Sequence, residues 1–314
     1  MQTKSRSFRE RLSLTGKRLI ANKERYVLIL PGIVWYAIFA YIPIFGLSLA
    51  FKKYMAKLGL FGSPWVGLKN FRNVFADPAF FASIGITFRI NAGRLLFVFP
   101  FPILFALMIN ELRLGRTKKI LQSIYTFPNF LSWVIVSSIM ISILGQRGLV
   151  NSVGAELFGA APVAFLGKPS YFQPMVYITD IWKTAGWSAI IYMASISGID
   201  VEQYEAAEID GATRLQRIWY ITLPCIRSTI MVLFILAVGR LMSDGFDQIF
   251  NLSNSATIKV AETLDMYIYR ITSKGSVDFA FSSAVALFRS SINMVLLLAA
   301  DRISKALGGT GLLG

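Results

Sequence analysis

The sequence contains no histidine and a single cysteine among its 314 residues. The lack of histidine excludes histidine-ligated metal sites, Ser-His-Asp triads and a histidine-based pH switch. Cys225 cannot form a disulfide within the chain, and its place at the start of an apolar run predicts a packing role. Most classes of enzyme are therefore poor candidates. An integral membrane enzyme is kept as a third hypothesis, after the two that are described below.

Charged residues are also scarce: they make up 16% of the chain, whereas 55% of its residues are hydrophobic. Soluble domains average about 25% charged and about 45–50% apolar residues, so this composition predicts an integral membrane protein. The net charge is nevertheless +15. Because lysine and arginine gather in the cytoplasmic loops of membrane proteins, this excess indicates topology and not nucleic-acid binding.

Six apolar segments are long enough to cross a bilayer, which takes about 20 residues. They are predicted near residues 26–51, 84–110, 120–145, 171–196, 224–242 and 279–300. Pro128 lies inside the third segment, where neighbouring helices can satisfy the carbonyl groups that it frees. The predicted fold class is all-α, with six transmembrane helices in one domain at 27–300, between a basic segment at 1–26 and a tail at 301–314.

The distribution of basic residues predicts the orientation of these spans. Lysine and arginine are densest before the first span and frequent again between the second and third spans. Because basic segments stay in the cytoplasm, the N-terminus is predicted to be cytoplasmic. The loop after the first span is also basic, so the difference in basic residues between the two sides of the membrane is incomplete. With six spans, this orientation places residues 197–223 in the cytoplasm.

The segment at 197–223 is predicted to hold two short helices joined by a glycine. Asp200 can cap the first helix, which starts at Val201, with Gln203 reaching back as in a capping box. Gly211 suits the left-handed conformation that ends a helix. Pro224 fits the first turn of the next helix, where an amide is unpaired anyway. By pattern alone, an ordinary connecting loop with an interfacial helix is an equally good interpretation.

The spacing in this segment resembles the signature of permease subunits of ATP-binding-cassette (ABC) importers. The signature residues are Glu205, Ala206, Ala207, Gly211, Ile221, Leu223 and Pro224. A second stretch, residues 65–78, resembles the first external loop of the sugar-transporting permeases. Within it, Phe71, Val74 and Phe75 form an apolar stripe suited to lying on the membrane face. The similarity extends most closely to oligosaccharide and polysaccharide importer permeases, including the alginate type.

The resemblance implies a type I importer permease in the cytoplasmic (inner) membrane of a bacterium, with a cytoplasmic coupling helix. The partners that it implies are a dimer of ABC ATPases, a second permease expected to be a different chain, and an extracytoplasmic solute-binding protein. It also implies that Glu205 enters a cleft on the ATPase, where Ala206 and Ala207 allow close approach. Gly211 would turn the chain, and Pro224 would fix the link to the next span.

The chain lacks a phosphate-binding loop of its own. Leu68 and Lys69 follow Gly67 at the place where such a loop requires Lys-Ser or Lys-Thr. We therefore expect no cofactor on this chain, with ATP and Mg²⁺ bound by the partner ATPase. The alternative function is a secondary transporter driven by an ion gradient, which needs intramembrane acids, and Asp180 is the one acid within the predicted spans.

Charged residues inside the predicted spans are candidates for contact with the solute, since each costs about 2.5–3.5 kcal/mol at mid-membrane. Asp180 and Lys183 are three residues apart on a helix and are expected to pair with each other. Arg89 and Arg94 lie near the outer end of their span, where their side chains can reach the interface. Arg289 lies far from both ends of its span and is the strongest candidate to face a pathway.

The spans carry five basic residues and one acidic residue, and this excess of positive charge suits an acidic sugar such as a uronate. A neutral sugar would use aromatic and amide side chains instead, although helix packing and interface positions also explain each aromatic. The predicted function is to form the pathway for a carbohydrate, which is expected to be an oligosaccharide. A more specific prediction is that this oligosaccharide is acidic. The predicted pathway residues are Asn129, Trp133, Trp182, Trp187, Arg289 and Asn293.

Overall fold

The computed structural model describes residues 21–112, 115–243, 245–273, 278–306 and 311. Within these ranges the regular elements are helices, and no β-strand is formed. The predicted all-α class is therefore confirmed. Most of the predicted basic segment at 1–26, and part of the predicted tail, lie outside the described residues.

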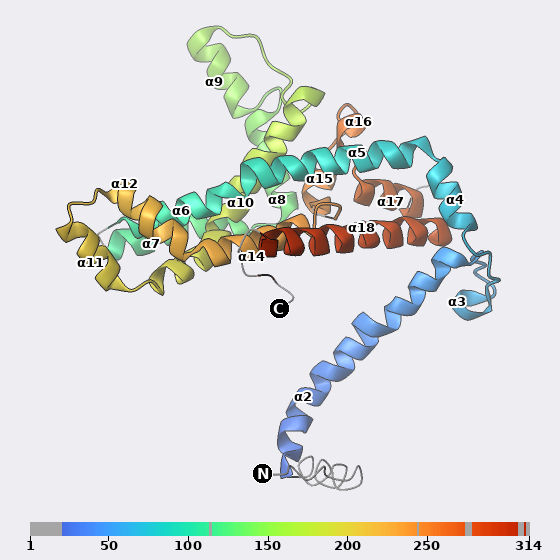
Figure 1. Cartoon of the computed structure of the whole chain (residues 1–314). Helices are drawn as coiled ribbons and strands as arrows, with labels where there is room; N and C mark the ends of the chain where they lie inside the picture. Colours follow the sequence, from blue (N-terminus) through green and yellow to red (C-terminus); the bar gives the residue numbers. More distant parts are fainter. Residues whose placement is uncertain (1–20, 113–114, 244, 274–277, 307–310, 312–314) are drawn as a thin grey trace, which may run out of the picture. The chain divides into compact units, whose positions relative to one another are not determined.

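The chain divides into two compact units, which consist of residues 1–71 with 279–284 and of residues 72–278 with 285–314. The first unit contains one long helical rod (Figure 1). The rod is built from α2 (Lys23–Tyr36), the π-helix η1 (Ala37–Tyr41) and the 3₁₀ helix η2 (Ile42–Phe51). No residue of its most apolar 18-residue window is buried within the chain. The rod agrees with the first predicted span, and its surface is available to lipid or to another subunit.

The end of this rod is tied to α4 (Lys69–Ala76) by one side chain. The amide of Asn70 donates to the carbonyl oxygens of Ala50 and Lys52, both at 2.9 Å. The short helix α3 (Gly59–Gly62) lies in the loop between them. The segment after the first span therefore folds back, so that Asn70 contacts the end of the rod.

The apolar stripe on α4 packs against protein, so its predicted place on the membrane face is wrong for the central residue. Val74 is fully buried. Within the first unit, Phe71 contacts Phe51 with ring centroids 5.3 Å apart. Within the second unit, Phe75 contacts Phe288 at the same separation. Aromatic partners elsewhere in the chain, which the local pattern does not reveal, account for the inward packing.

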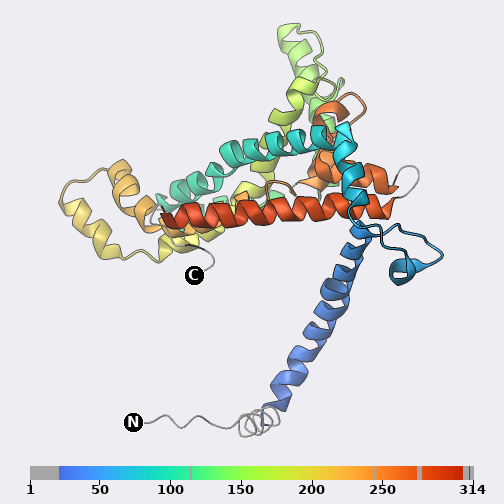
Figure 2. The same cartoon turned by 45° about the vertical axis from the view of Figure 1, so that its right-hand side comes forward.

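The second unit contains the remaining helices, with α18 contributing residues to both units. In chain order they are α5 (Pro78–Gly93), η3 (Arg94–Val98), α6 (Pro100–Asn110), α7 (Gly115–Thr126), η4 (Phe127–Phe130), α8 (Trp133–Leu144), α9 (Leu149–Phe158), α10 (Pro169–Ser197), α11 (Val201–Ile209), α12 (Arg214–Arg217), η5 (Ile218–Thr222), α13 (Leu223–Cys225), α14 (Arg227–Val238), α15 (Phe246–Leu252), α16 (Ile258–Ala261), α17 (Leu264–Ser273) and α18 (Phe279–Ala306). Figures 1 and 2 show α11 and α12 at one end of this unit and α15 to α17 toward the other.

Four helical stretches among the described residues are long and apolar enough to cross a membrane: Lys23–Phe51, Pro78–Asn110, Trp133–Phe158 and Phe279–Ala306. A fifth is formed if Arg214–Cys225 and Arg227–Val238, which meet at a 63° bend, are taken as one broken span. Helix α10 is 29 residues long but less apolar, because it carries Asp180 and Lys183 near its middle. Five of these six stretches overlap most of a predicted segment, whereas the third shares only residues 133–145 with its prediction.

The prediction of one continuous third span at residues 120–145 is wrong, because these residues do not form one helix. Helix α7 ends at Thr126, and Pro128 lies in the 3₁₀ turn η4. Leu131 is then extended, and the hydroxyl oxygen of Ser132 accepts from the amide of Ile135 to start α8. A proline and a new N-cap so close together end one helix and begin another. The apolar stretch that is long enough to cross the membrane begins only at α8.

Helix α10 lies at the centre of the second unit. Its first half packs Phe172 and Val176 against Ile90 of α5 and Ile249 of α15. Its second half joins a separate apolar cluster with α6 and α14, in which Tyr192 is almost fully buried. One side of helix α10 is therefore covered by protein, which permits polar residues there that lipid would not accept.

One hydrogen bond ties α17 to the beginning of α5, outside the apolar stretches. The phenol of Tyr267 donates to Oδ2 of Asp77 at 2.6 Å. Burial, and then the hydrogen bond to Asp77, raise the pKa of Tyr267, so the phenol keeps the proton that it donates. Asp77 also caps α5 by accepting from the amide of Ala79 at 2.8 Å.

Candidate functional site

Helices α11 and α12 with η5 form an elbow (residues 200–222) whose two helices are each closed by a cap. As predicted, Asp200 caps α11 by accepting from the amide of Glu202 at 3.0 Å. The predicted capping box at Gln203 is wrong, since its side-chain oxygen accepts from the thiol of Cys225 instead. The box lies on α12, where Thr213 and Gln216 bond each other's amides at 3.3 and 2.7 Å.

Gly211 connects the two helices of the elbow in a left-handed conformation, with φ = +76°, as predicted. A Cβ built at this position would meet no heavy atom within 4 Å. The requirement for glycine is therefore conformational and not steric. The amide of Ala212 donates to the carbonyl oxygen of Ala207 at 2.9 Å, which closes the end of α11.

Two side-chain contacts hold α11 against the following segment. Tyr204 and Thr222 share a hydrogen bond of 2.9 Å between their hydroxyl groups. Arg217 lies 3.2 Å from a carboxylate oxygen of Glu208. The chain then bends by 63° between the stretch that ends at Cys225 and α14. The elbow is thus braced by contacts between its own residues and leads through α13 into α14.

Several apolar side chains of the elbow are exposed. Ile209 is 87% exposed and Tyr220 is 79% exposed, and Leu215 and Trp219 are each about two-thirds exposed. Of the signature residues, Glu205, Ala206 and Pro224 are exposed, whereas Ala207, Ile221 and Leu223 are partly buried. Exposed apolar side chains on a short segment are typical of a surface that another protein or the membrane covers.

The predicted packing role of Cys225 is wrong, because Cys225 is exposed. Cys225 is the last residue of α13, just before the bend, and the buried residue of this turn is the next one, Ile226. An apolar run does not reveal which of its residues faces outward at a bend. The exposed thiol is useful, since it is the only cysteine in the sequence.

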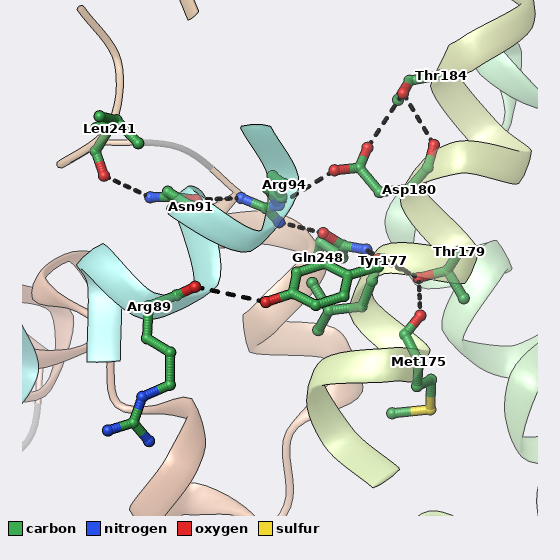
Figure 3. Close-up of polar contacts among 11 residues, drawn as sticks. Arg89, Asn91, Arg94, Met175, Tyr177, Thr179, Asp180, Thr184, Leu241 and Gln248 are labelled. Atoms are coloured by element: carbon green, nitrogen blue, oxygen red, sulfur yellow. Dashed lines mark hydrogen bonds and ion pairs between the residues drawn. The ribbon is translucent and has the colours of Figure 1, made fainter. Parts of the chain in front are cut away.

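A buried polar network surrounds Arg94, halfway along the stretch Pro78–Asn110 (Figure 3). Its Nη1 donates to Oδ1 of Asn91 at 2.9 Å, and its Nη2 donates to Oε1 of Gln248. Its Nε lies 3.1 Å from Oδ2 of Asp180. Gln248, in turn, donates to the hydroxyl of Thr179 at 2.8 Å. The network thus joins α5 with η3, α10 and α15.

Two expectations for these charges are wrong. Asp180 forms its ion pair with Arg94, and Lys183 instead donates to the carbonyl oxygen of Asn129 at 2.8 Å. Arg94 is 7% exposed and does not reach the interface. Sequence spacing identifies partners on the same helix, but the partners here come from other helices. Asn91 and Gln248, two further polar residues in apolar surroundings, were the signal that could have indicated this network.

The position of Arg94 depends on Gly245, the residue before α15. A Cβ at Gly245 would lie 2.1 Å from both terminal nitrogens of the guanidinium, and Gly245 also has φ = +86°. Gly245→Ala is therefore expected to displace Arg94 and to destabilise the protein by about 2–4 kcal/mol, from backbone strain and the disturbed buried ion pair. The measurement is thermal unfolding in detergent. Gly239→Ala is unsuitable as a control, because a Cβ at Gly239 would lie 2.6 Å from Cδ1 of Leu297.

The matched control for Gly245→Ala is Gly85→Ala in α5. Nothing lies within 4 Å of a Cβ at Gly85, and its φ is not left-handed. This variant is expected to unfold at the wild-type temperature or slightly above, since alanine favours a helix. Equal unfolding temperatures for Gly245→Ala and wild type would contradict the role given to Gly245.

A cavity of about 520 Å³ adjoins the network. Its polar lining includes Arg94, Asp180, Thr184, Arg240 and Gln248, and its apolar lining includes Trp133 and Tyr192. Ligand cavities in proteins typically measure about 300–1,000 Å³ and combine apolar walls with a few polar groups. The cavity therefore has the size and chemistry of a site for a small polar molecule.

Comparison with known proteins identifies the family. Residues 99–309 match the family described as "Binding-protein-dependent transport system inner membrane component". The chain belongs to this family. The permease is 40% identical to the polygalacturonan/rhamnogalacturonan transport system permease protein YteP of Bacillus subtilis (strain 168), over 94% of this chain and 92% of the relative. It is 24% identical to the lactose transport system permease protein LacF of Rhizobium radiobacter, over 83% and 87% of the two chains.

A solved structure has the same fold. It is the crystal structure of a bacterial alginate ABC transporter in complex with an alginate pentasaccharide-bound periplasmic protein, and one of its chains gives a TM-score of 0.85 at 36% identity. The match covers 94% of this permease and 99% of that chain. The predicted family, the fold class and the role as a transport permease of the inner membrane are therefore confirmed.

The predicted pathway residues lie in different surroundings within the permease. Trp133 lines the cavity, and Asn129 holds Lys183 through its carbonyl group. Trp182 and Trp187 are 43% and 50% exposed. Arg289 forms an ion pair with Asp265, and Asn293 accepts from the amide of Met242 at 3.0 Å. Contact of these six residues with a solute stays a prediction.

Proposed function

We propose that this permease forms one half of the pathway of an ATP-driven importer for acidic oligosaccharides, with its N-terminus and elbow in the cytoplasm. Its partners would be a cytoplasmic ATPase dimer, a second permease that is a different chain, and an extracytoplasmic solute-binding protein. The observation that carries the proposal is the capped elbow with its signature residues and exposed apolar side chains. Two similar systems transport polygalacturonan and alginate, and both of these polysaccharides are acidic, which favours an acidic solute.

The elbow can transmit movement because it is internally braced and joined to a membrane helix. The contacts Tyr204–Thr222 and Arg217–Glu208 oppose independent movement of α11. A force on α11 therefore reaches α13 and the bend before α14. Coupling also requires that the ATPase contacts the elbow differently in its open and closed states. Exposed Glu205 and the small side chains of Ala206 and Ala207 provide a surface that a cleft can approach closely.

The proposed second permease has a surface to bind. The rod Lys23–Phe51 buries none of its most apolar window within this chain. Lipid can cover such a helix, but a pathway made of two halves also requires an interface between them. We place part of that interface on the rod.

The ion-gradient alternative is disfavoured by the surroundings of Asp180. This residue is the one acid within the predicted spans. It lies 3.1 Å from Arg94, and the hydroxyl of Thr184 donates to its Oδ1 at 3.1 Å. An acid held by a permanent cation is poorly suited to bind and release an ion in each transport cycle.

A cysteine-labelling experiment tests the side and the partner of the elbow. In a Cys225→Ser background, Ile209→Cys is expected to react with a membrane-impermeant maleimide in inside-out vesicles and not in right-side-out vesicles. The reaction should be slowed at least about tenfold by the bound ATPase, since a covered side chain reacts only after dissociation. Ile209 is suitable because it is 87% exposed.

Phe61→Cys in the same background is the matched control, since Phe61 is 82% exposed and lies in the loop after the first span. It is expected to react only in right-side-out vesicles and to be indifferent to the ATPase. Labelling of Ile209→Cys from the outer side would overturn the orientation. Purification of a transport-competent assembly without any nucleotide-hydrolysing subunit would overturn the coupling role.

A further inference from the structure

The segment after the first span, residues 52–69, is basic on the side of the membrane where few basic residues are expected. In the proposed orientation this outer loop is extracytoplasmic, although lysine and arginine gather in cytoplasmic loops. Its four lysines are Lys52, Lys53, Lys57 and Lys69, and the sequence has no acidic residue from position 25 to position 76. The proposed transport function gives this charge no role.

One of the four lysines, Lys52, is used to build the outer loop. Lys52 is 4% exposed, and its Nζ donates to the carbonyl oxygens of Leu60 at 2.8 Å and Phe61 at 3.3 Å. The same Nζ lies 4.8 Å from the centre of the Trp65 ring. The outer loop is therefore folded around a buried ammonium group, and its exposed side chains are carried by a defined backbone.

The outer loop is fastened to the ends of two spans. Asn70, the next residue, binds the end of the rod Lys23–Phe51, as described above. Tyr54 contacts Phe279, the first residue of α18, with ring centroids 5.6 Å apart. Both the rod and α18 are long and apolar enough to cross the membrane. The outer loop is therefore held where two spans leave the hydrocarbon core, which is the level of the lipid headgroups.

The exposed surface of the outer loop combines cations with apolar side chains. The three remaining lysines, Lys53, Lys57 and Lys69, are exposed. Leu58, Phe61, Trp65 and Leu68 are each more than half exposed. Tryptophan favours the headgroup region, and a lysine can lay its aliphatic stem on apolar surface while its ammonium reaches outward. Such a mixture is typical of a segment that lies in the membrane interface.

An anionic lipid surface complements this charge. The three exposed lysines have one sign and no acidic residue lies among them, so their complement is a surface that presents several negative groups. Each lysine close to an anionic membrane strengthens binding about fivefold, or by about 1 kcal/mol. A protein would need an acidic patch at exactly this depth, whereas lipid headgroups surround the ends of the spans.

We propose that the outer loop binds anionic phospholipid headgroups of the outer leaflet, with Lys53, Lys57 and Lys69 at the phosphates and Trp65 at the headgroup boundary. The inference adds a lipid site to the proposed function, and it rests on the proposed orientation only for the choice of leaflet. The headgroup region is hydrated, so a thiol at position 61 stays within reach of a water-soluble maleimide.

The test measures which lipid lies beside the outer loop of the assembled importer in proteoliposomes. In a Cys225→Ser background, Ala56→Cys provides an exposed position between Lys53 and Lys57 for a nitrobenzoxadiazole fluorophore. Its quenching by nitroxide-labelled phosphatidylglycerol is divided by its quenching by equally labelled phosphatidylcholine, at equal amounts of the two lipids. We expect a ratio of about three or more at low salt. The ratio should fall toward one at about 1 M salt, because salt screens exposed charges.

Two triple variants with the same loss of charge separate the outer loop from the rest of the chain. Replacing Lys53, Lys57 and Lys69 with glutamine should bring the ratio to about one at low salt. Replacing Arg116, Lys118 and Lys119 of α7 with glutamine is the matched control on the predicted cytoplasmic side, and it should leave the ratio unchanged. Trp65→Ala should weaken quenching by both lipids, because an aromatic ring favours the interface whatever the charge of the headgroup.

The outcomes decide between lipid and protein. A ratio near one for the unmodified outer loop at low salt, or an unchanged ratio in its triple variant, would overturn the lipid site. Loss of quenching by both lipids when loaded binding protein is added would assign the outer loop to that protein instead. If the triple variant does not assemble, the salt dependence of the unmodified outer loop decides. Absence of ATP-dependent oligosaccharide uptake would overturn the proposed function, and the quenching ratio would still test the lipid site.

Discussion

Replacing Gly211 with alanine is expected to lower ATP-driven transport about tenfold while the permease still inserts and assembles. Gly211 has φ = +76°, and holding a residue with a Cβ in the left-handed region costs about 1–2 kcal/mol. An altered turn would move α12 relative to α11 and misplace the surface that the ATPase covers. Gly211→Val should have a larger effect, because a β-branched side chain tolerates this conformation least. Uptake and ATP hydrolysis in proteoliposomes are the measurements.

Gly198→Ala is the matched control, since Gly198 precedes the same helix but has φ = −85°, which any residue adopts. Its transport should equal that of wild type. Gly211→Asn should recover most of the activity, because asparagine enters the left-handed region more readily than other non-glycine residues. Wild-type transport by Gly211→Val would refute the conformational role, and poor activity of Gly211→Asn would point to a steric role that the open surroundings of Gly211 do not suggest.

Replacing Arg94 with methionine is expected to destabilise the permease by about 3 kcal/mol, since it removes the guanidinium that lies against the largely buried carboxylate of Asp180. The carboxylate would keep a hydrogen bond from Thr184 but would lose the guanidinium of Arg94. The oxygens of Asn91 and Gln248 would also lose a donor. The unfolding temperature of the purified complex in detergent is the measurement.

Two further variants separate the ion pair from general damage. Arg89→Met, five residues earlier in α5, changes an exposed arginine and should have little effect. The double variant Arg94→Met with Asp180→Leu should be more stable than the sum of the two single losses, because it removes both charges of the pair. Additive losses in this cycle would show that the pair contributes no coupling energy.

The elbow could be predicted from the sequence because the interactions that form it are local. A cap at Asp200 and a left-handed glycine at Gly211 each depend on residues within one helical turn. The residues that close the capping box were misassigned, although both Thr213 and Gln216 lie within the predicted segment. Local chemistry was therefore sufficient for the architecture of the elbow but not for every hydrogen bond within it.

The Arg94 network could not be predicted in the same way, because its members are far apart in the sequence. Arg94 bonds Gln248 across 154 positions, and Asn91 bonds the carbonyl oxygen of Leu241 across 150. Spacing along one helix favoured the pair Asp180 and Lys183, and the tertiary partner replaced it. For the same reason, the sequence suggested Arg289 as a residue facing the pathway, without showing that Asp265 pairs with it.

The modest hydropathy of α10 affects how the chain is made. Among the described residues, this helix is not one of those that qualify as a span by length and hydropathy. A nascent segment that carries Asp180 and Lys183 partitions poorly into lipid by itself. Arg94 lies earlier in the chain and is synthesised first. We therefore expect the entry of α10 into the bilayer during biogenesis to be favoured by the guanidinium of Arg94, which an earlier helix has already delivered.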